Sequence, residues 1–342
     1  MFTIVDPTAI KDWDQQIKDL PGASFFHCSA WAKVLKKAYG YTPLYFVNTD
    51  RKLDTVIPLM EVSSLLTGKR AVSIPFTDYC ELLAPHPEVS RVMFDVIGSE
   101  GKKRGWKYVE LRSDAGFLNG ERASASYYRH TLDLTPSVEK LVSGFRDSTR
   151  RNIRKAERSG VEVRFEKSLE ALRSFYRLNC LTRREHGLPP QPWAFFAKVH
   201  KEIISEGAGV IALGLWDGKV VAANLYMYSN GKVIYKYGAS DKTYQHLRAN
   251  NLLMWEAIKH FAGGKCTQLC FGRTEPVNEG LRQFKSGWGT KEEIINYYRY
   301  YLAREVYMPV EQGALMAARS LFTRMPIPVS RVLGLLLYRH VG

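Results

Sequence analysis

The chain has 342 residues, and its 49 lysines and arginines against 34 aspartates and glutamates leave a net charge of +15. Apolar residues make up 45% and charged residues 24%, an ordinary globular balance that excludes a disordered, collagenous or disulfide-stapled chain. The length suggests two domains, or one large one. The sequence has no apolar run of the roughly 18 residues that a membrane-spanning helix needs. Its first residues lack the regions of a signal peptide, so we expect a cytoplasmic protein.

The cysteine and motif patterns argue against a metal site and against a covalent nucleophile. The chain has 5 scattered cysteines, an odd number that predicts free thiols rather than a disulfide framework. It contains no HExxH, P-loop or GxSxG motif, and its 8 histidines are dispersed. We therefore expect no bound metal. The net positive charge points to an anionic partner, which is nucleic acid, a membrane surface or a phosphorylated ligand.

The first half predicts a meander of strands, then a helix, then further strands. Helical segments flank Trp31, and turn residues at Asp50-Arg51 and Thr67-Gly68 separate β-rich runs. A helix that ends at Gly105 follows. The expected strands cover about 43–48, 54–62, 70–74, 107–112 and 126–134, and the expected helix covers about 88–104.

A strongly basic segment lies between the halves. Pro136 suits the start of a helix and Gly160 suits its end, so we expect one helix over about 137–160. Its bases could form a solvated face favoured by the helix dipole, or they could bind an anionic ligand. We assign a substrate-binding role to Arg150 and Arg154. The six bases are Arg146, Arg150, Arg151, Arg154, Lys155 and Arg158.

The clearest local signal lies at 209–239, where three β-rich runs are separated by Asp217-Gly218 and Asn230-Gly231. These dipeptides favour two-residue hairpin turns, so we expect three antiparallel strands. A helix over about 251–262, a short strand over 267–272, a short helix within 278–289 and an aromatic strand over 292–302 follow. The order meander, helix, strand thus occurs twice, which indicates an internal structural duplication.

The second meander and its helix resemble the acyl-CoA N-acyltransferase (GNAT) superfamily. A helix N-terminus leaves backbone N–H groups free and can hold a pyrophosphate. Here that helix begins at about Asn250-Asn251, after Gln245 and Arg248, and we assign these four residues to donor binding. The glycines of the family's usual Q/R-x-x-G-x-G/A loop are missing, which puts ordinary coenzyme A binding in doubt.

Several segments resemble the FemAB-like branch of this superfamily more specifically. FGRTEPVNEGLRQFKSGWGTKEE resembles the C-terminal signature of that branch, and RRNIRKAERSGVEV resembles its basic helix. The segments SDKTYQHLRANNLLMWEAI, FHCSAWAKVLKKAYGY, VIPLME and SIPFTDYCELL also fit. The resemblance covers most of residues 20–305. It implies an α/β (α+β) fold of two tandem GNAT-like units, each a mixed, mostly antiparallel sheet flanked by helices. We place these units at 1–135 and 136–308, followed by a tail at 309–342.

The resemblance implies an acyl or aminoacyl transferase that forms an amide on an amine of a cell-envelope precursor. The acceptor would be a peptidoglycan precursor, a polyprenyl-linked saccharide or a lipid, and some relatives are associated with exopolysaccharide. The donor would be aminoacyl-tRNA, acyl-CoA or acyl-carrier protein, with no covalently bound cofactor. One alternative is an N-acyltransferase that makes an acylated lipid or sugar. Another is a basic RNA-binding module, against which the clustered charge and the absence of RRM, KH or OB signatures argue.

Direct acyl transfer needs a proton acceptor for the amine, a group that stabilises the oxyanion, and positioning. Lys285, in the F-K-x-x-W-G motif, is our first catalytic candidate, against the alternative of a surface lysine. Asp78 and Glu81 follow an apolar strand and a proline, and could take the amine proton, although Asp78 could equally cap a turn. Arg273 suits phosphate or carboxylate recognition, or an ion pair with a nearby glutamate. Further residues that could line the substrate cleft are Tyr79, Tyr237 and Ser240, although aromatic core packing is an equal alternative for the tyrosines.

The C-terminal segment 309–342 sets arginines among leucine, methionine, phenylalanine and valine. We expect two short amphipathic helices separated by the prolines at 326 and 328. Such helices could lie in an anionic membrane interface, at the inner face of the membrane, or pack back on the domain. The arginines are Arg319, Arg324, Arg331 and Arg339.

Overall fold

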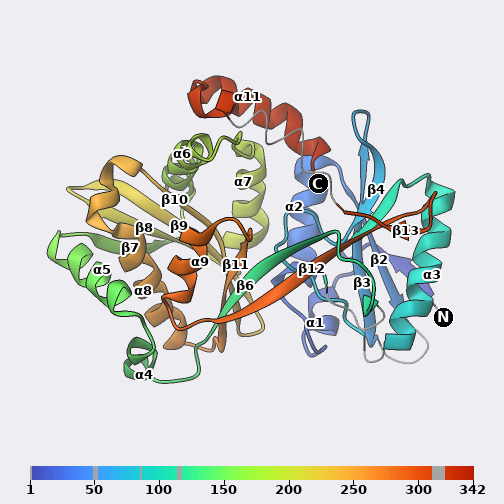
Figure 1. The fold of residues 1–342 in the computed structure, drawn as a ribbon, viewed down its shortest axis with the longest axis horizontal. Helices are drawn as coiled ribbons and strands as arrows, with labels where there is room; N and C mark the ends of the chain where they lie inside the picture. Colours follow the sequence, from blue (N-terminus) through green and yellow to red (C-terminus); the bar gives the residue numbers. More distant parts are fainter. Residues whose placement is uncertain (1, 49–52, 85–86, 114–117, 310–319) are drawn as a thin grey trace. The chain divides into compact units, whose positions relative to one another are not determined.

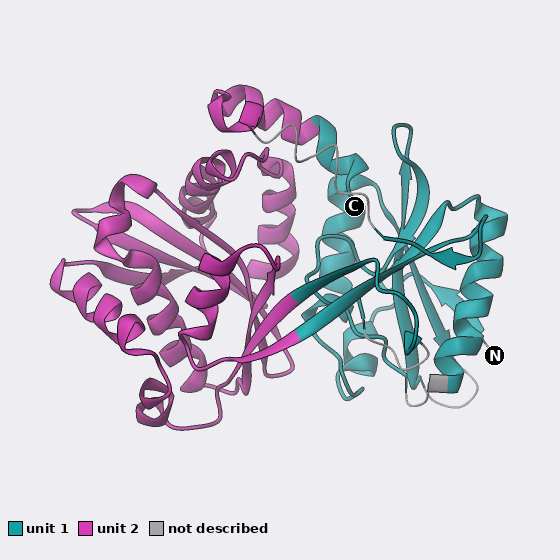
Figure 2. Cartoon of the chain, viewed as in Figure 1, with its two compact units in different colours: residues 1–127, 294–311, 336–342 teal, residues 128–293, 312–335 magenta. Residues whose placement is uncertain are grey.

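The computed structural model describes residues 2–48, 53–84, 87–113, 118–309 and 320–342. The chain forms two compact units (Figure 2). Unit 1 contains residues 1–127, 294–311 and 336–342, and unit 2 contains residues 128–293 and 312–335. The chain passes from one unit to the other within the long strands β6 (Ala125–Asp133) and β12 (Lys291–Tyr301), and again within helix α11 (Ile327–Leu337).

Unit 1 is built on a mixed sheet with the strand order β1-β2-β3-β4-β5-β12. Every neighbouring pair is antiparallel except β4 and β5, which run parallel. A parallel pair needs a crossover, and the long helix α3 supplies it. The strands are β1 (Phe2–Val5), β2 (Thr42–Asn48), β3 (Thr55–Ser64), β4 (Gly68–Val72), β5 (Tyr108–Leu111) and the short β13 (Val306–Tyr307), which pairs with β12.

The helices of unit 1 bury one apolar face each. Trp31, Val34 and Leu35 are fully buried on α2, which ends at Gly40 in the left-handed conformation that favours glycine. Trp13 and Ile17 are buried on α1. The helical elements are α1 (Trp13–Ile17), the 3-10 turn η1 (Phe25–His27), α2 (Ser29–Tyr39), α3 (Pro87–Arg104) and η5 (Tyr338–His340).

Unit 2 is built on a sheet with the strand order β6-β11-β10-β9-β8-β7. The turns at Asp217-Gly218 and Asn230-Gly231 have positive φ at both central residues, as expected for the two-residue hairpins that the sequence predicts. They join β8, β9 and β10 into an antiparallel meander. The strands are β7 (Glu162–Glu166), β8 (Gly209–Trp216), β9 (Lys219–Ser229), β10 (Lys232–Ser240) and β11 (Gln268–Thr274).

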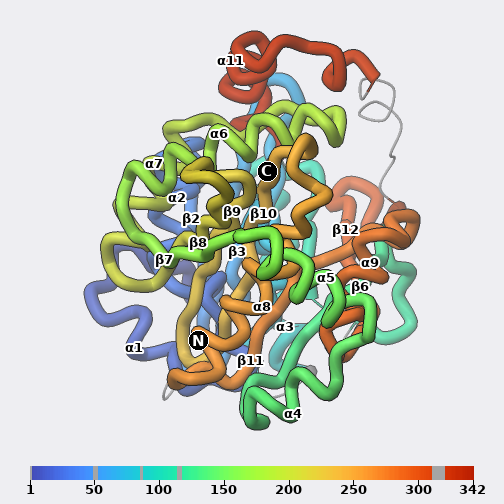
Figure 3. The backbone as a smooth tube through the Cα atoms, turned by 90° about the vertical axis from the view of Figure 1, so that its left-hand side faces the viewer, coloured from blue at the N-terminus to red at the C-terminus, as the bar shows by residue number. Residues whose placement is uncertain are grey.

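Helices cover both faces of the unit 2 sheet, with α6 and α7 on one face and α5 and α8 on the other (Figures 1 and 3). The helical elements are α4 (Val138–Ser143), α5 (Asp147–Arg158), α6 (Leu169–Glu185), α7 (Trp193–Val199), the π-helical turn η3 (His200–Ile204), the 3-10 turn η4 (Lys242–Leu247), α8 (Ala249–Ala262), α9 (Glu279–Ser286) and α11 (Ile327–Leu337).

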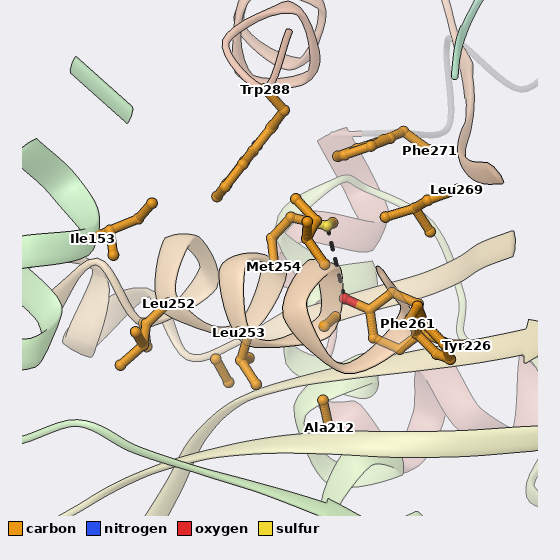
Figure 4. Close-up of a cluster of buried hydrophobic side chains, with 14 of the residues drawn as sticks. Ile153, Ala212, Tyr226, Leu252, Leu253, Met254, Phe261, Leu269, Phe271 and Trp288 are labelled. Atoms are coloured by element: carbon orange, nitrogen blue, oxygen red, sulfur yellow. Dashed lines mark hydrogen bonds between the residues drawn. The ribbon is translucent and has the colours of Figure 1, made fainter. Parts of the chain in front are cut away.

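The core of unit 2 packs α8 between α5 and the sheet (Figure 4). Leu253 and Met254 of α8 are fully buried, as is Tyr226 of β9, whose hydroxyl donates to the sulfur of Met254. Ile153 of α5 contributes from the far side of α8. Burying each such side chain stabilises the fold by about 1.5–3 kcal/mol. This packing fixes the N-terminus of α8 relative to the end of β10.

The two units share one topology. In each unit four antiparallel strands lead through a helix to a fifth strand, which is parallel to the fourth (β4 and β5, then β10 and β11). A strand that comes from outside this order then pairs antiparallel with the fifth strand. The duplication and the mixed, mostly antiparallel sheets predicted from the sequence are therefore confirmed.

The single helix expected over 137–160 was wrong, because two helices occupy this segment. α4 ends at Gly144, and α5 begins after Arg146, whose backbone is extended. The side chain of Phe145, 3% exposed, packs between Trp255 and Trp288, and this burial turns the chain away from the axis of α4. Burial of one aromatic side chain thus outweighs continued helix formation.

Two further expectations concern the chain ends and turns. No helix in the described part of the chain is long and apolar enough to cross a membrane. The expected turn at Asp50-Arg51 and the tail residue Arg319 lie outside the described residues. The second expected tail helix is present as α11, with Pro328 in its first turn, where a proline is tolerated.

Candidate functional site

The central strands of unit 2 separate at one end. β10 and β11 pair in parallel at Lys232–Ile234 and Gln268–Cys270, and their described pairing ends there, although both strands continue. β10 has an irregularity between Tyr235 and Tyr237 in its pairing with β9. β11 has another, between Cys270 and Arg273, in its pairing with β6.

The N-terminus of α8 lies at this end of the sheet. The side-chain amide nitrogen of Asn250 donates to the hydroxyl of Ser240 over 3.1 Å. This bond joins the first turn of α8 to the last residue of β10. Arg248 precedes α8 in the left-handed conformation. The structure thus brings Ser240 and Asn250 together, with the exposed side chains of Gln245 and Arg248 beside them in the chain.

The segment before α8 is a 3-10 turn rather than a glycine-rich loop. In it the N–H of Arg248 donates to the carbonyl of Gln245, and the N–H of Asn251 donates to the carbonyl of Arg248. Asn251 is itself 8% exposed. These two N–H groups are occupied within the turn, so they do not form the open cradle that a pyrophosphate would need.

Tyr237 and Ser240 are held by the helices on the other face of the sheet. The hydroxyl of Tyr237 donates to the side-chain oxygen of Gln191 over 2.8 Å. The hydroxyl of Thr182 on α6 donates to the carbonyl of Ser240 over 3.1 Å, and the N–H of Ser240 donates back over 3.0 Å. No sequence pattern pointed to Gln191 or Thr182, because these contacts join segments that lie 46 and 58 residues apart in the chain.

Lys285 is buried, with only 3% of its surface exposed, so the alternative of a surface lysine was wrong. Its ammonium group donates to the carbonyl oxygens of Gly272 and Arg273, each over 2.9 Å. Gly272 has φ +70° and lies at the irregularity of β11, which turns these carbonyls toward α9. The structure thus brings Lys285 and Arg273 together through the backbone of Arg273, and the two side chains are not joined by this contact.

A histidine that the sequence did not single out lies close to Lys285. His130 on β6 is fully buried, and its Nε2 lies 2.9 Å from a carboxylate oxygen of Glu292. Burial lowers the pKa of His130, and the nearby charge of Lys285 lowers it further, so its ring is neutral at pH 7. Glu292 also binds Arg282 through both oxygens, at 2.8 and 2.6 Å. The sequence signal that could have identified His130 is its position as a polar residue among the inward-facing residues of a strand.

The two arginines assigned on the basic helix differ in their surroundings. Arg150 donates to the carbonyls of Val142 and Ser143 and forms an ion pair with Asp147. These bonds hold the end of α4 to the start of α5. Arg154 is exposed on the face of α5 that points away from the core.

Asp78, Tyr79 and Glu81 belong to unit 1, in the segment between β4 and α3, whereas the other assigned residues belong to unit 2. Asp78 and Tyr79 are half-buried, and the Glu81 side chain is exposed. The hydroxyl of Tyr297 donates to the carbonyl of Asp78, and His27 Nε2 donates to that of Glu81.

The backbone just before Asp78 is strained. Ile74 and Phe76 have φ values of +49° and +61°, a conformation that costs about 1–3 kcal/mol for a residue with a side chain. It is especially unfavourable for β-branched isoleucine. Such strain persists where the surrounding structure requires a particular backbone path, and it is enriched at functional sites.

Trp288 and Phe284 pack together, as expected for core residues. Trp288, which is labelled in Figure 4, is fully buried against Phe145, and its ring centre lies 6.0 Å from that of Phe284. No cluster of three or more histidine, cysteine, aspartate or glutamate side chains suited to a metal is found among the described residues.

Part of the chain is similar to proteins of known family. Residues 143–286 match the family model described as an acetyltransferase (GNAT) domain. The lipid II:glycine glycyltransferases of two Staphylococcus epidermidis strains are 29% identical over 124 residues, a match that covers 34% of this chain. It covers only 29% of the length of these curated relatives.

Two solved structures share the fold over most of the chain. FemX is 15% identical with a TM-score of 0.70, and the superposition covers 89% of this chain and 98% of FemX. A tandem GNAT protein of clavulanic acid biosynthesis is 9% identical with a TM-score of 0.57, covering 88% of this chain and 98% of that protein. The chain therefore shares the fold of these two proteins, and its residues 143–286 match an acetyltransferase (GNAT) domain.

Proposed function

We propose that this protein is an aminoacyl or acyl transferase that forms an amide on an amine of a peptidoglycan precursor. The observation that carries the proposal is the position of Lys285, buried beside the separated ends of β10 and β11 in the GNAT domain. The likeness to lipid II:glycine glycyltransferases supports the substrate class. In this proposal the unit at 136–308 supplies Lys285, and the unit at 1–135 supplies Asp78 and Glu81.

The reaction joins a neutral amine to an ester or thioester carbonyl. The amine attacks the carbonyl carbon, a tetrahedral oxyanion forms, and the alcohol or thiol leaves with a proton. The ammonium of Lys285, in a site of low dielectric, stabilises the negative charge that develops on the oxygen or on a substrate phosphate. Asp78 and Glu81 are proposed to bind the incoming ammonium and accept its proton. Arg273, Tyr79 and Tyr237 are proposed to orient the substrates.

The turn before α8 favours a donor other than coenzyme A. Its N–H groups at Arg248 and Asn251 are bonded within the turn, and side chains occupy positions where the usual GNAT loop has glycines. We propose aminoacyl-tRNA as the donor, with the exposed bases of α5, among them Arg154, contacting its phosphates. Acyl-CoA and acyl-carrier protein are the competing donors.

The test is transfer of a labelled amino acid from tRNA to a lysine-containing peptidoglycan precursor. Lys285→Met should lower the rate about 10²–10³-fold, the effect of removing one group that stabilises an oxyanion. Lys291→Met is the matched control, because this nearby lysine has a side chain that is 76% exposed. Equal rates for both variants and the parent chain would exclude Lys285 from the chemistry.

The donor is identified separately by thermal shift with aminoacyl-tRNA, acyl-CoA and acyl-carrier protein. A donor that binds the folded chain raises its melting temperature by mass action. We expect stabilisation by aminoacyl-tRNA that weakens as salt rises. Stabilisation by acyl-CoA alone would replace the aminoacyl proposal with ordinary N-acyl transfer. Binding of tRNA without transfer to any amine would favour an RNA-binding module.

We also propose that the protein acts in the cytoplasm, at the inner face of the membrane, where a lipid-linked precursor would be presented. The basic and apolar segment 309–342 supports this location.

A further inference from the structure

A basic pocket on unit 2 is lined by none of the residues assigned to transfer. Helices α6, α7 and α11 enclose a volume of about 450 Å³. Arg173 and Arg177 from α6 and Arg331 from α11 line it, and no acidic residue is among its lining residues in the described part of the chain. Three guanidinium groups around one cavity create a positive potential that favours an anion.

Aromatic rings hold two of these arginines in place. The guanidinium carbon of Arg173 lies 5.4 Å from the ring centre of Trp193, and that of Arg331 lies 5.5 Å from the ring centre of Tyr176. A guanidinium that stacks on a ring keeps its N–H edge available for the oxygens of a phosphate. Arg177 donates one N–H to the carbonyl of Val220, which fixes its direction.

Tyr176, which lines the pocket, supplies a neutral hydroxyl group. Tyr176 is 7% exposed, and burial raises the pKa of its phenol to about 12, so it stays protonated at pH 7. Its hydroxyl adds no negative charge to the pocket, and it is hydrogen-bonded to the Arg331 guanidinium and to the Cys180 thiol. Cations, a neutral hydroxyl and the apolar side chain of Ile327 at the rim suit an anion attached to a hydrocarbon group.

Helix α11 carries an apolar face beside this pocket. Its inner side is fixed to unit 2, because Ser330 and Gly334 are buried and a methyl group on Gly334 would lie 2.0 Å from the carbonyl oxygen of Pro190. Its outer residues are about half exposed although they are all apolar. These are Val329, Val332, Leu335 and Leu336, at 49–57% exposure.

The charged residues in and around α11 are all basic. Residues 320–342 contain Arg324, Arg331 and Arg339 and no aspartate or glutamate. An apolar helix face flanked by arginines fits the interface of an anionic bilayer, where each base near the surface contributes about 1 kcal/mol. Arg331 reaches the pocket while its neighbour Val332 is exposed, so one helix contributes both to the pocket and to the apolar face.

We propose that the arginine pocket binds the phosphate head group of an anionic phospholipid while the outer face of α11 lies in the membrane interface. The occupant is a lipid rather than free phosphate, because the pocket and the apolar face share α11. The site contains none of the residues assigned to transfer, so its test requires no transfer activity.

The test measures binding of the full chain to vesicles by flotation. Vesicles of an equal mixture of phosphatidylglycerol and phosphatidylcholine are compared with vesicles of phosphatidylcholine alone. Arg331→Gln should weaken binding to the anionic vesicles about ten-fold or more, because it removes a charge-assisted contact to phosphate. Arg324→Gln removes the same charge from the same segment outside the pocket, and should weaken binding only about five-fold. Equal losses of vesicle binding in the two variants would contradict a phosphate-binding role for the pocket.

The apolar face is tested by a second pair of variants. Val332→Ser with Leu335→Ser should release the protein from the anionic vesicles. Leu65→Ser with Leu66→Ser is the control, because these leucines are 102% and 71% exposed in unit 1 and lie outside α11. Equal binding by both double variants and the parent chain would overturn the membrane face.

Tryptophan fluorescence separates a lipid from free phosphate. Anionic vesicles should change the emission of the parent chain, and Trp193→Phe should abolish that change. Inorganic phosphate should give no comparable change at millimolar concentration. A change produced equally by inorganic phosphate, with no binding to vesicles, would assign the pocket to a soluble anion and overturn the lipid proposal. Unchanged circular dichroism and melting temperatures establish that each variant is folded.

Discussion

The two units share a strand order but hold the buried charges beside their fifth strands in different ways. In unit 1, Glu110 of β5 is 5% exposed and is bound by Arg112 over 2.9 Å and by Arg299 over 2.6 Å. In unit 2, Lys285 is 3% exposed, and its ammonium group donates to two backbone carbonyls of β11. The carboxylate therefore meets two cations, whereas these two partners of the ammonium are neutral.

This difference separates a structural ion cluster in unit 1 from the site proposed around Lys285 in unit 2. Arg299 lies directly opposite Glu110 in the pairing of β12 with β5, so the ion cluster joins neighbouring strands of unit 1. Around Lys285 the carbonyl dipoles fix the position of the ammonium without changing its net charge. Unit 1 thus uses its buried charges to stabilise the sheet, and unit 2 retains a positive charge where the strands separate.

Glu110→Gln gives the largest expected effect on stability. It keeps the shape of the side chain but removes the charge that balances Arg112 and Arg299, and breaking a buried ion cluster in this way costs about 3–5 kcal/mol. Urea unfolding measures the loss, and binding of the donor should be unchanged at temperatures where the variant is folded. A loss below about 1 kcal/mol would show that the cluster contributes little to unit 1, and would remove the contrast with unit 2.

Acid should remove nearly the same stability. Burial alone would raise the pKa of Glu110, but the charges and hydrogen bonds of Arg112 and Arg299 outweigh it and lower the pKa to about 2. Since the carboxyl group titrates near 4.5 when the chain is unfolded, its contribution is fully present above pH 4.5. It is lost as the pH falls toward 2, and amounts to about 3 kcal/mol. Urea unfolding at several pH values should show this loss in the parent chain and a smaller one in Glu110→Gln.

The parts of the fold that depend on local chemistry could be predicted from the sequence. The Asp-Gly and Asn-Gly turns specified the meander of unit 2, because few residue pairs adopt two consecutive positive φ values. The glycines after residue 262 correctly marked the end of α8. The break between α4 and α5 was missed because it depends on Phe145 finding Trp255 and Trp288, which lie more than 100 residues away in the chain.

The candidate site shows the same limit. The motif around Lys285 indicated the residue, but its burial depends on the irregular pairing of β11 with β6, which motif spacing does not reveal. His130 of β6 likewise meets Glu292 of β12 across more than 150 positions of the sequence. Residue types therefore indicated the chemistry, and strand register determined which side chains meet.

The bond between Ser240 and Asn250 tests whether the first turn of α8 is held to β10. A double-mutant cycle of Ser240→Ala and Asn250→Ala should give a coupling energy of about 1 kcal/mol, the usual net value of one hydrogen bond. Urea unfolding of the four proteins measures it. If the two changes are additive, the bond does not hold the helix to the strand. A fixed position of α8 would then have to come from the apolar core alone.

Lys102→Ala should have the smallest effect, although Lys102 forms an ion pair with Glu305 in the same unit as Glu110. The side chains of Lys102 and Glu305 are 56% and 61% exposed, so water screens their attraction and removing one of them leaves no buried charge. We expect no measurable shift in the urea midpoint of Lys102→Ala, at low or high salt. A loss as large as that of Glu110→Gln would mean that unit 1 depends on ion pairs in general. No loss would locate the electrostatic stability of unit 1 in its buried cluster, because burial is what distinguishes Glu110 from Glu305.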